Sequence, residues 1–437
     1  MLAVRSKHNV SRCRSTVVGG RFLRGPNRNG PIERSERIVS IDVLRGFAVL
    51  GILIMNIQSY SMIDAAYLNP HAYGDLGGAN YGVWFLSYLL ADSKFMTIFS
   101  LLFGAGVVLM ASRREASGRS TAGIHYRRMF WLIVFGLLHG CFLWYGDILY
   151  AYGICGLVIY LFRRRSPRFL LIGGSLVVAV ASLLTMFWQV TMPYWPAEAV
   201  QQVETEWWMP PPEMVQAELD AYRGGWSEQQ AKRFPTAVFM QTNHFLTETL
   251  WRAGGLMLIG MALFKLGVFG AERTRRFYLR MTSLGFGLGL SIVIFGVLYR
   301  NDCGWDVRSA FFGGSQFNYW GSLMVAAGWI GAVMLVCQRP GWDRVKRTLA
   351  AVGRMALSCY LLQTIICTTI FYGHGLGLYG SVNRVGQALI MLAVWAFLLA
   401  ACPLWLRYFR FGPFEWLWRS LTYMKLQPMR IDRVESH

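Results

Sequence analysis

One histidine and one aspartate flank a tight turn between two apolar segments, and the two side chains could act together in proton transfer. His139 lies between glycines in the stretch from Gly136 to Gly140, and Asp147 follows the turn. An imidazole titrates near neutral pH and can act as a general base, and a carboxylate that the turn folds back could orient it. The alternative is a histidine whose hydrogen bonds only join helices, and the sequence leaves both interpretations open.

The first apolar segment carries three polar side chains on one side. Asp42, Arg45 and Asn56 fall within about 60° of one another at 100° per helical residue, and Arg45 and Asn56 lie about 16 Å apart along the axis. Ser40 is predicted to cap this helix, and Asp42 suits the positive end of its dipole. Such groups are expected to face a cavity or a partner helix. A structural ion pair from Asp42 to Arg45, with an inter-helix hydrogen bond from Asn56, would explain them equally well.

Asp92 and Lys94 lie inside the second apolar segment, which is too long for one straight span. Residues two apart do not face each other on a regular helix. This pair therefore predicts either a break or tilt of the helix near residues 91–94, or a regular helix in which each charge contacts a different neighbouring helix.

A late apolar segment, from Gly353 to Thr364, is polar on more than one face. Tyr360, Thr364 and Thr368 recur every four residues, and Gln363 lies beside them. This pattern favours a helix in the interior of a bundle over one that faces lipid.

Ten apolar segments must position these residues, which predicts an all-α, polytopic transmembrane helix bundle. A bilayer core about 30 Å thick needs about 20 helical residues. Hydrophobic residues make up 54% of the chain and charged residues 15%, which excludes a soluble protein. The predicted spans are Val43 to Met62, Val83 to Met110, Met129 to Trp144, Ile148 to Phe162, Phe169 to Met192, Leu250 to Phe269, Met281 to Tyr299, Trp320 to Val336, Met355 to Tyr372 and Val385 to Leu406.

Lysine and arginine are concentrated in every second connection, and this alternation predicts the orientation of the bundle. Most of the 43 basic residues lie in the segment up to Arg45, after the second, fourth, sixth and eighth spans, and in the C-terminal tail. Because short cytoplasmic loops carry the positive excess, both termini are predicted to be cytoplasmic. The net charge of +20 then reflects topology and anionic lipid, which argues against nucleic acid as a partner.

Three segments are predicted to lie outside the spans of the transmembrane domain, residues 37–422. Residues 1–36 lack an apolar period and predict a disordered basic cytoplasmic tail, and residues 423–437 form a second cytoplasmic tail. Residues 193–249 are acidic and contain a proline run, which predicts an extracytoplasmic loop with short helices over the mouth of the bundle. A solvated loop with tryptophans at the membrane interface would explain the segment equally well. No cleavable signal peptide is convincing, so the first apolar segment is expected to be a permanent helix.

Common catalytic and metal-binding motifs are absent from the sequence. No Walker sequence, HExxH or GxSxG occurs, which argues against ATP-driven transport and the commonest hydrolase classes. The eight cysteines show no metal-binding spacing, so no metal is predicted. The Gly285 to Gly289 repeat has no preceding strand, so it predicts close helix packing rather than dinucleotide binding.

Short motifs are spread along the chain from about Arg37 to Thr422. They are Ser40 to Gly46, Gly51 to Asn56, Lys94 to Thr97, Phe103 to Gly106, His139-Gly140, Gly146 to Leu149, Gly353 to Thr364, Arg407 to Arg410, Gly412-Pro413 and Glu415 to Trp418. In combination they resemble the YeiB-like bacterial membrane proteins, known as domain-of-unknown-function family 418, although Cys359 stands where many relatives carry asparagine. The resemblance implies a multi-pass protein of the bacterial inner membrane. That family is largely uncharacterised, and some members are labelled as transport proteins.

The opening motif has a second, more distant likeness. Its SxDxxRG pattern at Ser40, Asp42 and Arg45 is similar to that of membrane acyltransferases of the heparan glucosaminide acetyltransferase type, which move an acyl group from coenzyme A in the cytoplasm to a sugar outside. In that group a histidine after the first helix is thought to act as base. His71 is its nearest counterpart by position here, although several YeiB-like relatives lack it, and His139 is the preferred base.

This likeness implies membrane-embedded transfer from a cytoplasmic acyl-thioester, with acyl-coenzyme A as the possible donor, to an envelope saccharide or a similar acceptor. Such transfer needs a base, donors for an oxyanion and cations for phosphates. The competing class is a secondary, proton-coupled transporter of a small molecule, although no internal repeat supports it. We expect His139, Asp147, Asn56 and Gln363 in the catalytic centre, and Arg45, Asp42, Asp92, Lys94, Arg127, Arg128 and Arg354 in substrate or donor binding.

Overall fold

The chain is helical over almost the whole of the part that the structure describes. The computed structural model describes residues 38–431, so the predicted tail of residues 1–36 and the last residues of the C-terminal tail lie outside the described residues. Within this range the one strand-like pairing is an isolated bridge between Phe409 and Arg430, and the all-α prediction is confirmed.

The order of the helices follows the chain without a long irregular segment. The α-helices are α1 (Val39–Ser61), α2 (Ala65–Leu68), α3 (Gly78–Leu90), α4 (Lys94–Ala116), α5 (Ala122–Leu138), α6 (Leu149–Ile159), α7 (Pro167–Thr191), α8 (Ala197–Val203), α9 (Pro212–Arg223), α10 (Trp226–Phe239), α11 (Leu250–Lys265), α12 (Arg275–Asp302), α13 (Val307–Ala310), α14 (Ser315–Gln338), α15 (Asp343–Arg354), α16 (Ala356–Phe371), α17 (Arg384–Tyr408) and α18 (Pro413–Tyr423). Short π- or 3₁₀-helical turns continue several of them, namely η2 (His139–Leu143), η3 (Tyr160–Phe162), η4 (Met192–Tyr194), η5 (Glu204–Trp208) and η6 (Met240–Thr249).

Among residues 38–431, six helical segments are long and apolar enough to cross a membrane, which defines a multi-pass bundle. They contain α1, α3 with α4, α7, α12, α14 and α17, and the bent pair of α15 and α16 makes a seventh if it counts as one span. The other three predicted spans correspond to α5, α6 and α11, which have 17, 11 and 16 residues. The prediction of ten spans is thus met in part, because these three helices are short and continue as π- or 3₁₀-helical turns.

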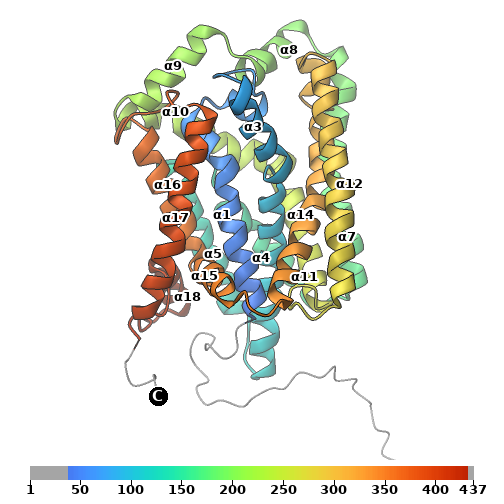
Figure 1. The fold of residues 1–437 in the computed structure, drawn as a ribbon, viewed down its shortest axis with the longest axis vertical. Helices are drawn as coiled ribbons and strands as arrows, with labels where there is room; N and C mark the ends of the chain where they lie inside the picture. The colour runs from blue at the N-terminus through green and yellow to red at the C-terminus, as the bar shows by residue number, and fades with distance from the viewer. Residues whose placement is uncertain (1–37, 432–437) are drawn as a thin grey trace, which may run out of the picture. The chain divides into compact units, whose positions relative to one another are not determined.

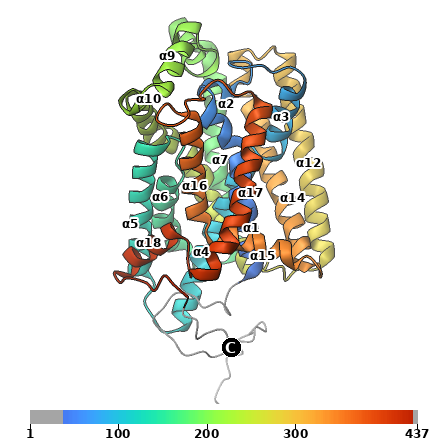
Figure 2. The same cartoon turned by 60° about the vertical axis from the view of Figure 1, so that its left-hand side comes forward.

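The spans differ in how much of their surface other helices cover. In the apolar stretch of α1, 67% of residues are buried, against 28% in α7 and α12 and 22% in α17. Figures 1 and 2 show α1 among the other helices, and Figure 2 shows α12 at the edge of the bundle. Exposed apolar side chains such as Leu284, Leu288 and Phe295 cover α12. Surfaces of this kind are stable against lipid rather than water.

Glycines allow the closest helix contacts. A Cβ atom on Gly104 of α4 would lie 1.9 Å from the carbonyl oxygen of Met257 in α11. A Cβ atom on Gly285 of α12 would lie 2.4 Å from the backbone nitrogen of Gly328 in α14, and the predicted close packing at this glycine repeat is confirmed. The hydrophobic effect does not drive helices together in lipid. Small residues at such crossings let the backbones approach closely, so that van der Waals packing holds the helices together.

Helix α1 begins differently from the sequence-based expectation. Its first residue is Val39, and the hydroxyl of Ser40 donates to the carbonyl oxygen of Phe269 at 2.7 Å. The prediction that Ser40 caps the helix is therefore wrong, because a tertiary partner takes its hydroxyl. Asp42 lies in the first turn, as expected.

Two breaks interrupt the long apolar segments. Helix α3 ends at Leu90 and α4 begins at Lys94, with Ser93 in the left-handed region at φ 63°, so the predicted break near residues 91–94 is confirmed. Helices α15 and α16 meet at 78°. The carboxylate of Glu415 accepts from the backbone N–H groups of Leu357 and Ser358 at 2.7 and 3.1 Å, which satisfies the exposed start of α16.

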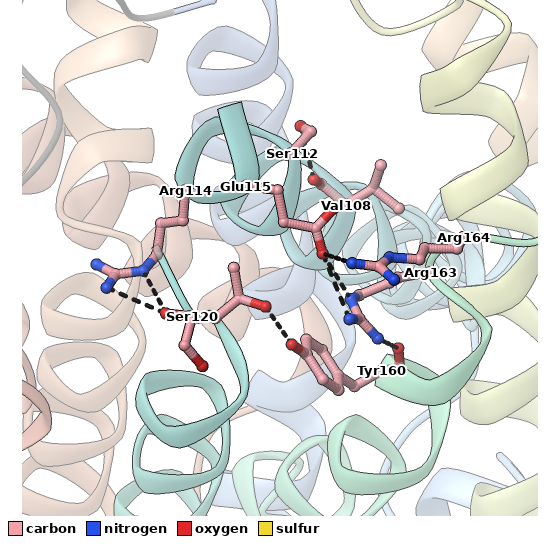
Figure 3. A network of polar contacts seen from close by, with 9 residues as sticks. Val108, Ser112, Arg114, Glu115, Ser120, Tyr160, Arg163 and Arg164 are labelled. Carbon is pink, nitrogen blue, oxygen red and sulfur yellow. Dashed lines mark hydrogen bonds and ion pairs between the residues drawn. The ribbon is translucent and has the colours of Figure 1, made fainter. Parts of the chain in front are cut away.

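The segment of residues 193–249 forms short helices at one end of the bundle, as predicted. Figure 1 shows α8 and α9 at this end and α15 and α18 at the opposite end. We call α8 to α10, with η5 and η6, the cover. At the opposite end Glu115 lies within 3.3 Å of Arg163 and 3.1 Å of Arg164, and the hydroxyls of Thr121 and Tyr160 are hydrogen-bonded (Figure 3). This network fastens the end of α4 to the connection between α6 and α7.

Candidate functional site

His139 and Asp147 meet at the end of α5 that lies toward the cover. Nδ1 of His139 lies 2.9 Å from Oδ1 of Asp147, and both side chains are buried. Oδ2 of Asp147 accepts from the backbone N–H of Tyr150 at 2.8 Å, so the carboxylate is held at both oxygens. A carboxylate only accepts hydrogen bonds, so Nδ1 carries a proton, and an imidazole that carries only this proton has Nε2 as an acceptor.

The other ring nitrogen meets a hydroxyl. Nε2 of His139 lies 3.0 Å from Oγ1 of Thr364 in α16, and that hydroxyl lies 2.7 Å from the hydroxyl of Tyr60 in α1. Asp147, His139, Thr364 and Tyr60 thus form a hydrogen-bonded chain, which we call the His139 chain. It draws on three helices far apart in the sequence. A base oriented by a carboxylate and within 3.2 Å of a hydroxyl has the geometry of general-base catalysis.

The local sequence explains how the turn folds onto the histidine. His139 begins the π-helical turn η2, and such turns widen a helix so that its residues shift out of the regular pattern. A Cβ atom on Gly136 would lie 2.7 Å from Oδ2 of Asp147, and one on Gly140 would lie 2.2 Å from Nε2 of Gln241. The two glycines that flank the histidine therefore make room for its partners.

Three buried hydrogen-bond donors beside the His139 chain have no partner among residues 38–431. They are Nε1 of Trp144, Nε2 of Gln241 and the hydroxyl of Tyr360, whose ring centroid lies 5.1 Å from that of His139. The Trp144 ring centroid lies 6.3 Å from that of His139 and 4.4 Å from that of Tyr60, and Gln241 packs on Gly140. Buried donors without partners cost about 1 to 3 kcal/mol each. Donors retained at such a cost beside a base are candidates for binding a ligand oxygen.

A pair of carboxylates joins the cover to the bundle. Oε1 of Glu218 in α9 accepts from the backbone N–H of Asp64 at 2.8 Å and from the hydroxyl of Tyr379 at 3.0 Å, and Oε2 lies 3.1 Å from Nζ of Lys232. Burial, together with the charge of Glu218, raises the pKa of Asp64 to about 7, while Tyr145 and Lys232 act in the opposite direction. The contact between cover and bundle therefore contains a carboxyl group that titrates near neutral pH.

Asp92 and Lys94 belong to a different cluster, on the other side of α1. Nζ of Lys94 donates to the side chain of Asn318 at 2.6 Å, and Asn318 in turn donates to Asp92 at 2.6 Å. The hydroxyl of Tyr67 donates to the second oxygen of Asp92 at 2.8 Å. The sequence therefore identified buried charges correctly, but the structure does not join them to His139 by the hydrogen bonds that it describes.

Other predicted residues of the first helix and of α16 are dispersed. Asp42 and Arg45 form the i,i+3 ion pair at 3.0 Å. Asn56 is half-buried in α1, and Nε2 of Gln363 donates to the carbonyl oxygen of Val49 at 3.1 Å. That bond occupies Gln363 in joining α16 to α1.

The remaining predicted cations lie toward the end opposite the cover. Arg127 is exposed, with its guanidinium 2.9 Å from Sδ of Met424. Arg128 stacks on Trp418 at 4.4 Å, and Arg354 is half-buried at the end of α15. His71 is exposed and its ring meets the edge of Trp305 at 5.3 Å, so it is not part of the His139 chain.

The start of α1, at the end of the bundle opposite the cover, borders a cavity of about 670 Å³. Its lining includes Ser40, Asp343, Lys346 and Arg347, and Nζ of Lys346 lies 2.9 Å from Oδ1 of Asp343. Arg347 is therefore the basic side chain of this lining that could meet an anionic ligand.

Sequence reasoning missed several residues of the site. Thr364 and Tyr60 were visible only as polar residues within apolar helices, and no spacing pairs them with His139. Trp144 and Gln241 carry no sequence signal of their own, because tryptophan and glutamine near a membrane surface are ordinary.

The bundle and the His139 chain define a class: a polytopic α-helical membrane protein with a buried histidine–aspartate centre. The chain belongs to the family described as "Protein of unknown function (DUF418)", whose profile matches residues 263–425. It is 32% identical to the uncharacterized protein YeiB of Escherichia coli (strain K12), over 89% of this chain and 96% of that protein.

Two further relatives come from other bacteria. The uncharacterized protein YxaH of Bacillus subtilis (strain 168) is 31% identical over 91% of this chain and 97% of its own length. An uncharacterized 39.9 kDa protein of Bacillus acidopullulyticus is 26% identical over 92% and 99%. No solved structure matches the chain.

Proposed function

We propose that this protein transfers an acyl group from a cytoplasmic acyl-thioester to a hydroxyl or amine of an envelope saccharide or similar acceptor. The observation that carries the proposal is the His139 chain, in which a carboxylate-oriented imidazole presents Nε2 to a hydroxyl at 3.0 Å. The hydroxyl of Thr364 occupies the position that an acceptor hydroxyl would take during the reaction.

The proposed step follows from these groups. The acceptor oxygen attacks the thioester carbonyl while its proton passes to Nε2 of His139, and Asp147 stabilises the imidazolium that forms. The carbon–sulfur bond then breaks, and the thiolate takes up the proton. Trp144 and Gln241 are suited to bind the oxyanion, since their buried N–H groups have no other partner in the described chain.

The cations at the opposite end support the binding of an anionic donor such as acyl-coenzyme A. Arg45 lies about 22 Å from Tyr60 along α1, at 1.5 Å per residue, so an extended donor would have to reach along this helix. Lys346 and Arg347 border the 670 Å³ cavity at its start. Arg127, Arg128 and Arg354 lie toward the same end, and charge-assisted bonds from such side chains suit phosphate.

The proposal includes an orientation in the bacterial inner membrane. We infer ten crossings, with α5, α6 and α11 as short spans, both termini in the cytoplasm and the cover outside. The alternation of basic connections supports this orientation. Labelling of single cysteines placed at Gly118 and Gly224 tests it, and labelling of Gly118→Cys from outside with Gly224→Cys protected would reverse it.

The activity is tested with purified protein in liposomes and labelled acyl-coenzyme A. We expect donor binding and transfer to envelope saccharides, with donor binding weakened in Arg45→Ala. Arg308→Ala is the matched control. Arg308 is an exposed arginine of α13, at the same end of the bundle as the cover, and this variant should bind donor as the wild type does. Absence of donor binding by the folded wild-type protein would refute the proposal.

Proton-coupled transport is the second candidate, and the continuous hydrogen-bonded chain from Asp147 to Tyr60 favours it specifically. Hydroxyls and imidazole both donate and accept, so such a chain can pass protons. Proton-driven solute uptake by the same liposomes, without donor binding, would decide for transport.

A further inference from the structure

Three buried cations gather on the other side of α1 from His139. Lys94 begins α4, Arg252 lies in the first turn of α11, and Arg300 lies in the last turn of α12. Their exposed fractions are 0%, 1% and 6%. The end of α12 lies toward the cover, since Trp305, which follows α12, accepts from the indole of Trp208 in η5, while Lys94 lies at the break inside the span Gly78–Ala116.

Shared neighbours hold the three cations together. Lys94 donates to the carbonyl oxygen of Tyr88 at 2.7 Å, and Arg300 donates to the hydroxyl of the same residue at 3.1 Å. Lys94 also donates to Asn318, and the guanidinium of Arg252 stacks on the next residue, Tyr319, at 4.3 Å. We call Lys94, Arg252 and Arg300 the cation cluster.

The two arginines of the cation cluster have no carboxylate partner. Asp92 is the one carboxylate that the hydrogen bonds of the cluster include among residues 38–431, and it is reached through Asn318 from Lys94. Glu248 is half-buried and acts on the cluster only at longer range, through its charge on Tyr67 and Tyr319. The other titratable groups that face the cluster are the tyrosines.

Each arginine also has a buried donor without a partner. Nε of Arg252 and Nε of Arg300 have none among the described residues. The other donors of Arg252 meet only neutral groups, the hydroxyl of Ser322 at 2.7 Å and the carbonyl oxygen of Tyr319 at 3.4 Å. A buried charge is normally paired or binds an ion, since desolvation costs several kcal/mol.

We propose that the cation cluster is a binding site for one oxyanion group, a carboxylate or a phosphate, of a ligand that enters from the cover end of the bundle. An oxyanion would place a negative charge beside Arg252, whose hydrogen bonds reach only neutral groups, and would accept from its free Nε. Arginine favours planar or tetrahedral oxyanions over halide because its donors form a rigid fork. The site is separate from the His139 chain, so it stands whether or not the protein transfers acyl groups.

The test is a thermal-unfolding titration of the whole protein in a phosphate-free maltoside detergent at constant ionic strength. Sodium chloride is replaced stepwise by sodium phosphate or sodium acetate, and phosphatidylglycerol is added to mixed micelles in a separate series. We expect a saturable rise in the unfolding temperature. A response to phosphate or acetate assigns the site to a free ligand, and a response to phosphatidylglycerol alone assigns it to a lipid headgroup.

Two substitutions with opposite expected signs sharpen the test. Arg252→Gln should weaken the apparent anion affinity about tenfold or more, because a charge-assisted hydrogen bond is lost. Asp92→Asn removes a competing carboxylate and should strengthen the affinity. Arg384→Gln is the matched control, since Arg384 is also 1% exposed with a free Nε, but it binds the carbonyl oxygens of Pro70 and Asp75 outside the cluster.

Arg384→Gln should lower the unfolding temperature and keep the anion response. The absence of any anion response by the folded wild-type protein would overturn the proposal. So would an equal loss of response in Arg252→Gln and Arg384→Gln. The wild-type titration decides the question even if a variant fails to fold.

Discussion

The His139 chain and the cation cluster are both buried and polar, yet they are built in opposite ways. In the His139 chain each side chain is hydrogen-bonded to the next in line. The cation cluster holds charges that are bound to carbonyl, amide and hydroxyl groups rather than directly to a carboxylate. Burial alone therefore does not distinguish chemistry from binding. The order of donors and acceptors favours reaction in the first region, and buried arginines without a carboxylate partner favour a ligand in the second.

The largest expected effect is on the rate of acyl transfer, which should depend on the His139 chain. His139→Gln removes the base, and a general base contributes about 10² to 10⁴ in rate, so transfer should fall by that factor while the unfolding temperature changes little. The measurement is transfer from labelled acyl-coenzyme A in liposomes. His125→Gln is the control, because His125 is buried in the same helix and lies 2.9 Å from the carbonyl oxygen of Gly156 without a carboxylate. Equal loss in both variants would show that the fold, not the base, was affected.

The second prediction breaks the cation cluster instead. Lys94→Met leaves Oδ1 of Asn318 and the carbonyl oxygen of Tyr88 without their donor and should cost about 2 to 3 kcal/mol of stability, because two buried acceptors lose a hydrogen bond. Thermal and chemical unfolding in detergent measure it. Lys232→Met, in a pair whose lysine is 36% exposed, should cost about 1 kcal/mol or less. Similar losses of stability in Lys94→Met and Lys232→Met would contradict the expected difference between a fully buried and a partly exposed lysine.

The sequence predicted the two regions unequally, for physical reasons. Asp147 and His139 are eight residues apart across one turn, so local geometry was enough to pair them. Thr364 meets His139 across 225 positions, and no local pattern encodes that contact. Arg252 and Arg300 lie near helix ends, where arginine ordinarily reaches the membrane surface, so their burial was not expected.

Some features of the fold were likewise predicted correctly from the sequence, and others were not. The break at Ser93 was predicted because two charges two residues apart disagree with a regular apolar helix. The number of membrane-length helices was overestimated, because apolar segments such as Ile148 to Phe162 fold as helices too short for a straight span. Periodicity identifies apolar segments, and tertiary packing decides how long a helix each one forms.

A smaller effect tests the third member of the His139 chain. Thr364→Val keeps the branched shape and removes one hydroxyl, which should cost about 0.5 to 1.5 kcal/mol of stability and lower transfer about tenfold at most. Thr368→Val is the control, since Thr368 is equally buried in α16 and bonds to the carbonyl oxygen of Ile365. A loss as large as that of His139→Gln would mean that Thr364 itself accepts the acyl group before the final acceptor does.

The smallest expected effect concerns pH and the contact between the cover and the bundle. Burial and the charge of Glu218 raise the pKa of Asp64 from 3.8 to about 7, so the folded protein binds this proton more tightly than the unfolded chain does. The stabilisation is therefore complete below about pH 4 and is lost as the pH rises to about 7. Hydrogen-exchange protection of α9 and α10, corrected for intrinsic rates, should fall across this window. Asp64→Asn should abolish that fall.

Asp75→Asn is the control of opposite sign. The N–H of Gly77 lowers the pKa of the exposed Asp75, so the contribution of Asp75 to the stability of the protein changes only below about pH 4. Protection that is independent of pH in the wild-type protein would show that the cover does not depend on this carboxyl group.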